Sequence, residues 1–301
     1  MIVSQVAELI GETPMYHLSR DRHDVYIKLE QMNIGGSIKD RLGYYLIERA
    51  LATGLIRKGD TVIEPTAGNT GIGLALACLE HHLHLVVVVP EKFSVEKQQI
   101  MHALGAKIVL TPSELGMDGA ISEAKDWLMD GRAHYMPNQF ENTWNPAAYH
   151  TLADELWRDA KGQIDLFVAG GGSGGTFTGV LQRLRHYNSE IQGVLVQPKG
   201  SGLVGDKSDY AIEGIGMDDF APFMVKEEIN EIMEISDREA FYFTKQLAAR
   251  YGLLVGSSSG AAFAAVEKIL ARATKKMHIV TIFPDGAERY LQSGIYERSG
   301  T

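Results

Sequence analysis

Several short stretches of the chain combine glycine with amine, hydroxyl or amide side chains that could do chemistry. The first is Asn33-Ile-Gly-Gly-Ser-Ile-Lys-Asp-Arg41. Ser37 can serve as the N-cap of a helix that continues to about Thr53, which places Lys39 in the first helical turn. The positive end of a helix disfavours an ammonium group and so favours the neutral amine that a Schiff base requires. A surface lysine balanced by Asp40 is the alternative, and for a lysine taken alone it is the commoner one.

The second stretch, Glu64-Pro-Thr-Ala-Gly-Asn-Thr-Gly71, runs from a strand end into a helix start. Backbone N–H groups at such a start, together with the side chains of Thr66, Asn69 and Thr70, form a receptor for a carboxylate or a phosphate. A tight turn capped by asparagine or threonine would look the same and need no function, so this motif alone does not decide between the two.

The third stretch is Gly170-Gly-Gly-Ser-Gly-Gly-Thr176, directly after a strand that ends at Ala169. Glycines let the main chain approach an anion closely, and the following helix adds its dipole, so we expect a phosphate site. The spacing also fits the G-x-G-x-x-G pattern of dinucleotide-binding proteins. That pattern expects an acidic residue about 20 positions later, where this chain has Leu195-Val-Gln-Pro-Lys199. The sequence therefore favours a phosphate other than that of a nicotinamide cofactor.

The fourth stretch, Leu254-Val-Gly-Ser-Ser-Ser-Gly-Ala261, is another turn from a strand into a helix. Ser258 could donate a hydrogen bond to a ligand, or it could simply cap the helix. The histidines and the single cysteine show no metal-binding spacing, and we predict no metal site. Cys78 lies in an apolar stretch and is expected to be a buried thiol.

Alternating strand-like and helix-like stretches position these motifs. The expected strands are 61–65, 85–90, 106–110, 164–169, 193–197 and 278–283. The expected helices are 72–80, 96–104, 147–159, 176–187, 237–251 and 260–271. This order predicts an α/β protein with parallel sheets covered by helices, in two lobes with a cleft between them. The stretch 199–223 has weak periodicity and is expected to be a loop.

Composition limits the class of protein. With 301 residues, 45% hydrophobic and 22% charged, the chain is expected to be globular with about two domains. A formal net charge of −9 argues against a nucleic-acid partner. The N-terminus lacks the pattern of a signal peptide, and the apolar runs are too short to cross a bilayer. We therefore expect a cytoplasmic protein without a membrane partner.

Taken in order, the motifs resemble those of the cysteine synthase and cystathionine β-synthase family, the fold type II enzymes that depend on pyridoxal 5′-phosphate (PLP). The resemblance covers essentially the whole chain and is carried by Ile10–Pro14, Gly35–Arg41, Pro65–Gly71, Gln139-Phe140, Gly172–Thr176, Glu213–Gly216, Ser257–Gly260 and Pro284–Tyr290. It implies a two-lobed, three-layer α/β/α fold like that of the tryptophan synthase β-subunit, with PLP in the cleft between the domains. The implied parts are an N-terminal segment packing on the large lobe (1–36), a small lobe with the substrate carboxylate loop (37–145) and a large lobe with the PLP phosphate loop (146–301).

The resemblance also implies roles for single residues. Lys39 would bind the cofactor covalently and later move the Cα proton of the substrate. The other implied cofactor-binding residues are Asn69, Gly172, Ser173, Gly174, Gly175, Thr176 and Ser258. The implied substrate-binding residues are Thr66, Ala67, Gly68, Thr70, Gln139 and Gly214. Ser258 would face the pyridine nitrogen with a neutral hydroxyl, which makes the cofactor a weaker electron sink and favours prompt β-elimination.

The implied activity is β-replacement on O-acetylserine or serine through an aminoacrylate intermediate. Homocysteine would give cystathionine and sulfide would give cysteine, both from small-molecule amino-acid substrates bound by a homodimer. Glu213-Gly-Ile-Gly216 and Thr66-Ala-Gly-Asn-Thr70 most resemble bacterial O-acetylserine-dependent cystathionine β-synthases. Ala67 replaces a serine common in cysteine synthases and leaves the leaving group open.

Other functions stay open at this point. A serine/threonine dehydratase or a diaminopropionate synthase would share the fold. From different classes, an NAD-dependent oxidoreductase would use the glycine pattern, and a binding protein would use the fold without catalysis.

Overall fold

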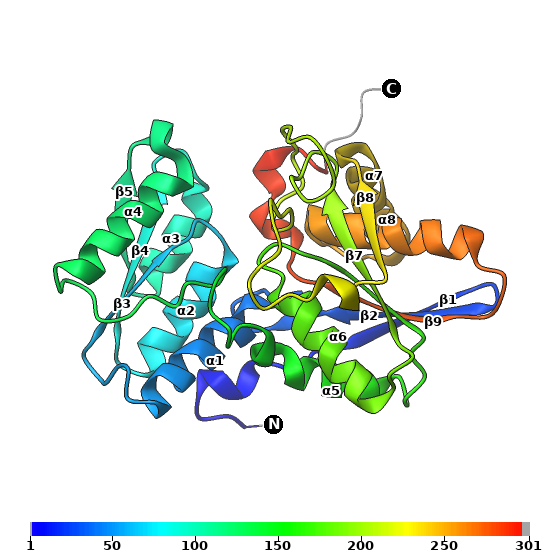
Figure 1. Ribbon diagram of the computed structural model, residues 1–301, viewed down its shortest axis with the longest axis horizontal. Helices are drawn as coiled ribbons and strands as arrows, with labels where there is room; N and C mark the ends of the chain where they lie inside the picture. Colours follow the sequence, from blue (N-terminus) through cyan, green and yellow to red (C-terminus); the bar gives the residue numbers. More distant parts are fainter. Residues whose placement is uncertain (1, 297–301) are drawn as a thin grey trace. The chain divides into compact units, whose positions relative to one another are not determined.

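The computed structural model describes residues 2–296, whose helices and strands are labelled in Figure 1. Their contacts divide the chain into two compact units. The first unit comprises the residues up to Gly11 together with Asn33–Trp144. The second unit comprises Glu12–Met32 together with the described residues from Asn145 onward. The three-part division expected from the sequence stays a prediction.

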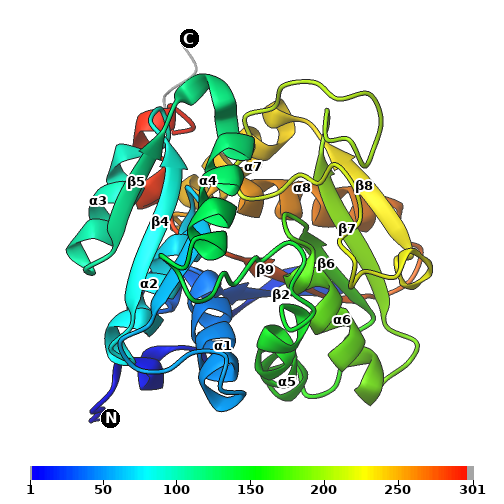
Figure 2. The same cartoon turned by 60° about the vertical axis from the view of Figure 1, so that its left-hand side comes forward.

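The first unit contains a parallel sheet with the strand order β3-β4-β5. The strands are β3 (Thr61–Pro65), β4 (His84–Pro90) and β5 (Lys107–Thr111). The helices are α1 (Lys39–Ala52), α2 (Asn69–Glu80), α3 (Val95–Ala103) and α4 (Gly116–Met129), with short 3-10 turns η1 (Val6–Leu9) and η3 (Ser113–Leu115). Figure 2 shows β4 and β5 with α3 and α4 beside them.

Alternation along β4 explains why helices cover both faces of this sheet. Val87 and Val89 belong to an apolar cluster that includes residues of α1, α2 and α3. Val86 and Val88 belong to a second cluster, with small residues of α4. Because successive side chains of a strand point to opposite faces, an unbroken run of valines fits a parallel sheet buried on both sides.

Cys78 of α2 lies in the first of these clusters and is 2% exposed. Its burial raises the pKa of the thiol to about 12. The expectation of a buried thiol is confirmed.

The second unit contains a six-stranded sheet with the order β1-β2-β9-β6-β7-β8. Its strands are β1 (Met15–Arg20), β2 (His23–Leu29), β6 (Leu166–Gly170), β7 (Gln192–Pro198), β8 (Glu231–Ile235) and β9 (His278–Phe283). Its helices are α5 (His150–Asp159), α6 (Gly175–Tyr187), α7 (Asp237–Tyr251) and α8 (Ser257–Arg272). The short 3-10 turns are η2 (Glu30–Met32), η4 (Pro146–Tyr149), η5 (Lys226–Glu228), η6 (Ala287–Arg289) and η7 (Leu291–Ser293).

The strand pairings of the second unit are parallel except one. β1 pairs antiparallel with β2, which departs from the expected parallel arrangement. A short turn can join antiparallel neighbours, whereas parallel strands need a crossover connection, and residues 21–22 are enough for this hairpin.

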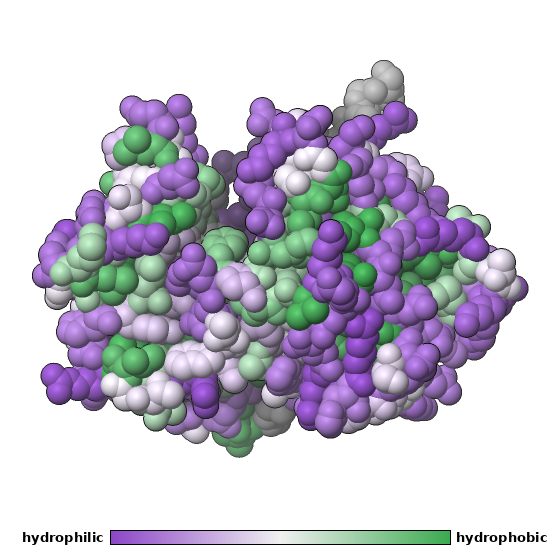
Figure 3. Space-filling model, in the orientation of Figure 1, coloured by the Kyte–Doolittle hydropathy of each residue, from purple (hydrophilic) through white to green (hydrophobic). Residues whose placement is uncertain are grey.

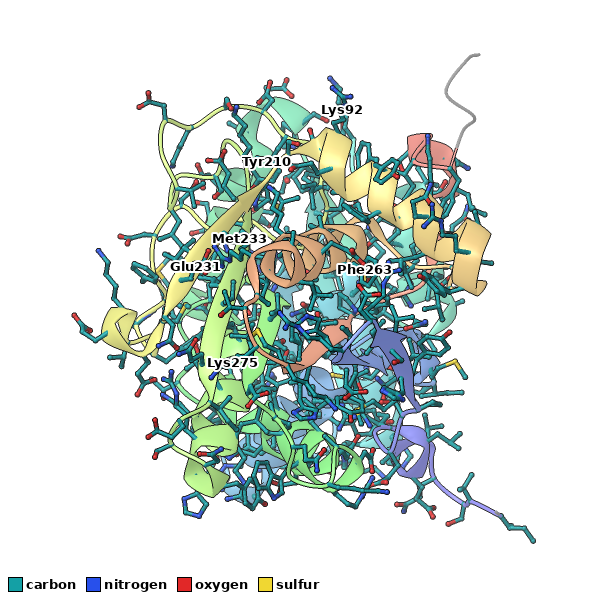
Figure 4. All side chains as sticks on the ribbon, turned by 90° about the vertical axis from the view of Figure 1, so that its right-hand side faces the viewer. Lys92, Tyr210, Glu231, Met233, Phe263 and Lys275 are labelled. Atoms are coloured by element: carbon teal, nitrogen blue, oxygen red, sulfur yellow. The ribbon has the colours of Figure 1, made fainter. Side chains whose placement is uncertain are left out.

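Helix α8 forms much of the core of the second unit. Phe263 of α8 and Met233 of β8, both labelled in Figure 4, belong to one buried apolar cluster. The stretch 199–225 contains no regular helix or strand, as its weak periodicity predicted. Within residues 2–296, no helix is both long and apolar enough to cross a membrane. On the face shown in Figure 3, hydrophilic residues cover much of the surface.

Two glycines allow α1 and α2 of the first unit to touch through their backbones. A Cβ added to Gly43 would lie 2.3 Å from the carbonyl carbon of Gly73. A Cβ added to Gly73 would lie 2.3 Å from the carbonyl oxygen of Lys39. Since real Cβ atoms do not come this close to backbone, both positions require glycine. The contact fixes the first turn of α1 against α2.

The N-cap prediction for this helix is wrong by one residue. Helix α1 begins at Lys39, and Ile38, with a helical φ of −56°, stands at the N-cap position. The Ser37 hydroxyl nevertheless accepts a hydrogen bond from the N–H of Lys39 at 3.2 Å. Ser37, the residue before the N-cap position, therefore accepts a backbone N–H of the first turn. Lys39 lies in that turn as expected.

We predict that Gly73→Ala destabilises the protein despite alanine's higher helix propensity. The added methyl group must displace the backbone at Lys39, and overpacking of this kind costs about 2 kcal/mol or more. Urea unfolding measures the change in free energy. The matched control is Gly68→Ala, because a Cβ at Gly68 meets nothing within 4 Å. Equal stability of the two variants would contradict the proposed backbone contact.

Candidate active site

Lys39 is held by a loop whose backbone is fixed from within the first unit. Gly36 has a φ of +78°, a conformation that glycine adopts without strain. The Asp40 carboxylate accepts the N–H of Gly35 at 2.6 Å, and Asp40 is 0% exposed. Asp40 is therefore a buried part of the loop, which argues against the alternative of a surface lysine balanced by a surface carboxylate.

The polar turn between β3 and α2 lies in the same unit. The Thr66 hydroxyl accepts the N–H of Gly68 at 3.3 Å. The Thr70 hydroxyl donates to the Gln139 side-chain oxygen at 2.8 Å, across 69 positions of sequence. Asn69 is the first residue of α2, and Gly73 follows it by one turn against the Lys39 carbonyl. The turn 66–70, Gln139 and Lys39 are thus gathered around the beginning of α2.

The Glu64 carboxylate holds the backbone of Gln139 near this turn. The segment that precedes Gln139 runs beside β3, where the N–H of Ile63 donates to the carbonyl of Tyr135 at 2.9 Å. The two carboxylate oxygens of Glu64 then accept the N–H groups of Asn138 at 2.8 Å and of Gln139 at 3.2 Å. Asn138 has a φ of +48°, a left-handed conformation that costs free energy in residues other than glycine. The carboxylate compensates for this strained turn.

Burial changes the ionisation of Glu64. The residue is 1% exposed, and desolvation raises its pKa from 4.5 to about 7, while the two backbone hydrogen bonds act in the opposite direction. A group that titrates near neutrality therefore holds the backbone of Gln139.

The glycine-rich loop lies in the second unit, between β6 and α6. Gly174 stands at the N-cap of α6 in the left-handed conformation, with a φ of +83°. A Cβ at Gly175 would lie 1.8 Å from the Asn145 side-chain oxygen. Asn145 is 0% exposed and donates to the Ser173 hydroxyl at 3.2 Å. The first turn of a helix leaves backbone N–H groups without intrahelical partners, so this small-residue loop suits an anion such as phosphate.

Gly214 and Ser258 are brought together in the same unit. A Cβ at Gly172 would lie 2.6 Å from the Gly214 carbonyl oxygen. A Cβ at Gly214 would lie 4.0 Å from the Ser258 hydroxyl. Helix α8 begins at Ser257 with Gly256 at its N-cap, so Ser258 is the second helical residue rather than the cap. The glycine-rich loop, the 213–216 turn and the start of α8 are therefore neighbours.

The dinucleotide alternative lacks its acidic partner in the structure as well. Strand β7 ends with Gln197 and Pro198, and Gln197 is fully buried. Its amide group bonds to protein backbone, so it does not stand in for a ribose-binding carboxylate. Among residues 2–296, no group of three or more histidine, cysteine, aspartate or glutamate side chains could hold a metal ion.

The sequence motifs did not identify three residues that support the candidate site, Glu64, Asn145 and Gln197. Their partners lie far away in sequence, and no local motif predicts such partners. The signal that could have found Glu64 and Gln197 is a polar side chain within an otherwise apolar buried strand.

Comparisons with known proteins agree with this geometry. The family described as pyridoxal-phosphate dependent enzyme matches residues 6–285. A cysteine synthase of Helicobacter pylori is 48% identical over 98% of this chain and 100% of its own length. An O-acetylserine dependent cystathionine β-synthase of Bacillus subtilis is 45% identical over 98% of both chains. The crystal structure of an O-acetylserine dependent cystathionine β-synthase from Helicobacter pylori superposes with a TM-score of 0.94 at 47% identity, covering 98% of this chain and 99% of that one.

We predict that Glu64→Gln flattens the dependence of stability on pH. In the unfolded chain Glu64 titrates near its ordinary value of 4.5, whereas its folded pKa is about 7. Between these values the folded state binds more protons, so the stability that this group contributes below pH 4.5 is lost as the pH rises through 7. The wild type should lose about 1 kcal/mol more than the variant between pH 6 and pH 8.

Urea unfolding at a series of pH values measures this difference. Glu91→Gln is the control, since it makes the same substitution at a residue that is exposed in the folded protein. A Glu64→Gln profile parallel to that of the wild type would show that Glu64 does not titrate in this range.

Proposed function

The chain belongs to the family of pyridoxal-phosphate-dependent enzymes, and from this premise we propose that it replaces the β-substituent of O-acetylserine with a sulfur nucleophile. Homocysteine as nucleophile gives cystathionine, and sulfide gives cysteine. The relatives named above as cysteine synthase and as O-acetylserine dependent cystathionine β-synthase support both reactions.

The observation that carries the proposal is the arrangement around the beginning of α2. An amine, Lys39, and a polar turn suited to a carboxylate are locked into one unit by the backbone contact at Gly73. We assign the substrate carboxylate to the turn 66–70 and to Gln139, whose side chain already bonds to Thr70. An amino acid bound there by its carboxylate presents its Cα to a nearby base.

The second unit offers groups that fit the cofactor. The loop Gly172–Thr176 suits a phosphate, and the 4% exposed Ser258 offers a neutral hydroxyl for a pyridine nitrogen. Asn69 of the first unit is assigned to the ring hydroxyl. When bound, PLP supplies an electron sink for the electrons left by the Cα proton.

Lys39 is assigned two tasks, covalent attachment and proton transfer. A primary amine forms a reversible bond with an aldehyde and, once released, accepts a proton from the substrate Cα. The buried Asp40 and the backbone contact at Gly73 fix the first turn of α1. The Lys39 side chain therefore starts from a rigid backbone, which limits its direction.

The carboxylate turn bears on which leaving group the enzyme accepts. Ala67 brings no hydroxyl, the Thr70 hydroxyl donates to Gln139, and the Thr66 hydroxyl accepts the N–H of Gly68. Hydroxide, the leaving group of a serine substrate, departs poorly unless a hydrogen-bond donor assists it, whereas acetate departs readily. We therefore propose O-acetylserine rather than serine as the first substrate.

The assembly and the location stay predictions. We infer that the enzyme works as a homodimer in the cytoplasm, and sedimentation of the purified protein tests the first part. Its small-molecule amino-acid substrates fit the enzymes to which it is similar.

We predict that Lys39→Ala abolishes covalent cofactor attachment. After borohydride reduction, the wild type should carry one PLP adduct on the peptide that contains Lys39, and the variant none. Turnover should fall by at least about 1,000-fold, because the proton-transfer group is lost. Lys92→Ala is the control, since Lys92 lies at the surface in Figure 4 and should retain the adduct and turnover.

The product assay tests the reaction itself. Purified protein is incubated with O-acetylserine and either sulfide or homocysteine, and the products are identified by mass. We expect cysteine, cystathionine or both. Pyruvate or diaminopropionate without any thiol or thioether product would instead favour the dehydratase or the diaminopropionate synthase.

We also predict that Ser258→Asp lowers the share of β-replacement among the products. A carboxylate at this position would enforce protonation of the pyridine nitrogen and strengthen the electron sink, so side reactions at Cα should increase relative to β-replacement. Ser258→Ala should keep the ratio of products nearer to that of the wild type. An unchanged product ratio in Ser258→Asp would contradict the assigned partner of the nitrogen.

A further inference from the structure

Gln197 lies where three loops of the second unit meet. It is 0% exposed and occupies the carboxyl end of β7. Its amide nitrogen donates to the carbonyl of Gly171 at 2.9 Å. Its amide oxygen accepts the N–H of Met217 at 2.9 Å and the hydroxyl of Ser201 at 3.2 Å. One buried side chain thus satisfies polar groups of three separate segments.

The Gly171 carbonyl is shared between two of these segments. It accepts the N–H of Gly216 at 2.8 Å in addition to the amide of Gln197. Gly171 directly precedes the phosphate loop, and Gly216 is the last residue of the 213–216 turn, which carries Gly214. A Cβ at Gly171 would lie 3.1 Å from the Gln197 nitrogen, so the side chain fills the space against this backbone.

Hydrogen bonds anchor both ends of the turn that carries Gly214. The N–H of Glu213 donates to the Ser257 hydroxyl at 3.0 Å, which ties one end of the turn to α8. The bonds of Gly171 and Gln197 to Gly216 and Met217 tie the other end to β6 and β7. Gly214 lies between these two anchored ends, so the hydrogen bonds at both ends determine its position.

We infer that Gln197 is a positioning residue that couples the phosphate loop to the Gly214 turn, so that one amide sets both cofactor affinity and amino-acid binding. The inference rests on the proposed function for the roles of these two segments. Its chemistry requires an amide: the nitrogen must donate to Gly171 while the oxygen accepts from Met217, and no carboxylate or hydrocarbon does both.

The test compares Q197E with the wild-type holoenzyme. At pH 8, where the introduced carboxyl is ionised to the greatest extent, the substitution keeps the size and the accepting oxygen of the side chain but removes the donor to Gly171, so that two acceptor oxygens face each other in a buried place. We expect PLP to dissociate about tenfold more readily, since an unsatisfied buried polar group has an effect of this order. At saturating PLP, KM for O-acetylserine should rise several-fold while kcat stays within about threefold.

Two further variants separate positioning from general disruption. Q192E adds the same charge to the exposed start of β7 and should match the wild type in all three measurements. S201A removes only the hydroxyl bonded to the Gln197 oxygen and should change PLP affinity much less than Q197E. A loss of PLP affinity in S201A as large as that in Q197E would overturn the inference.

The pH dependence of PLP affinity gives an independent test. Burial favours the neutral form of the introduced carboxyl, and its proton can then be donated to the Gly171 carbonyl. The ratio of PLP affinities between wild type and Q197E should therefore shrink as the pH falls from 8 to 6. Wild-type affinity and KM in Q197E at every pH would overturn the inference. Absence of product in the wild type would refute the proposed function but would leave the comparison of PLP affinities valid.

Discussion

The contact between the backbones of α1 and α2 is the constraint on which the first unit depends. Gly73 has no side chain, and the carbonyl of Lys39 occupies the space that a Cβ would need. The same helix α2 begins one turn earlier with the polar residues assigned to the substrate carboxylate. The distance between the backbone of Lys39 and the turn assigned to the substrate carboxylate is therefore determined by direct backbone contact, which varies less than side-chain packing would.

The second unit uses buried amides in a comparable way. Asn145 fills the space beside Gly175 and bonds to Ser173, while Gln197 links Gly171 to the following loops. Glycines create room for close backbone approach, and a buried amide then satisfies the polar groups that this approach exposes. Glu64 has a similar role in the first unit, where its carboxylate supports the strained turn at Asn138.

Local signals in the sequence predicted local structure well. The helix 237–251 was predicted with its exact bounds, since Ser236 and Glu239 form a capping box and Gly252 ends the helix with a φ of +68°. The strand at 278–283 was also exact, because it is an apolar run with clear ends. The β1–β2 hairpin was missed since its strands carry mixed polar residues, and the cap of α1 was misplaced because Ser37 acts from outside the helix.

The candidate site followed from motif order, whereas its supporting residues did not. The roles predicted for Lys39, the turn 66–70 and the loop 172–176 came from contiguous motifs. The partners Glu64 with Gln139 and Gln197 with Gly171 are separated by 75 and 26 positions, and only the fold brings them together. Contiguous motifs therefore predict candidate reacting groups, whereas the contacts that orient them are visible only in the folded chain.

The isolation of Cys78 matters for an enzyme whose proposed second substrate is itself a sulfur compound. The chain contains a single cysteine, enclosed in the apolar core with its thiol held protonated. Disulfide exchange requires a thiolate within reach of the attacking sulfur. Homocysteine, cysteine and their oxidised forms thus find no partner for a mixed disulfide in the folded protein, and the catalyst is protected from the redox chemistry of its own reactants.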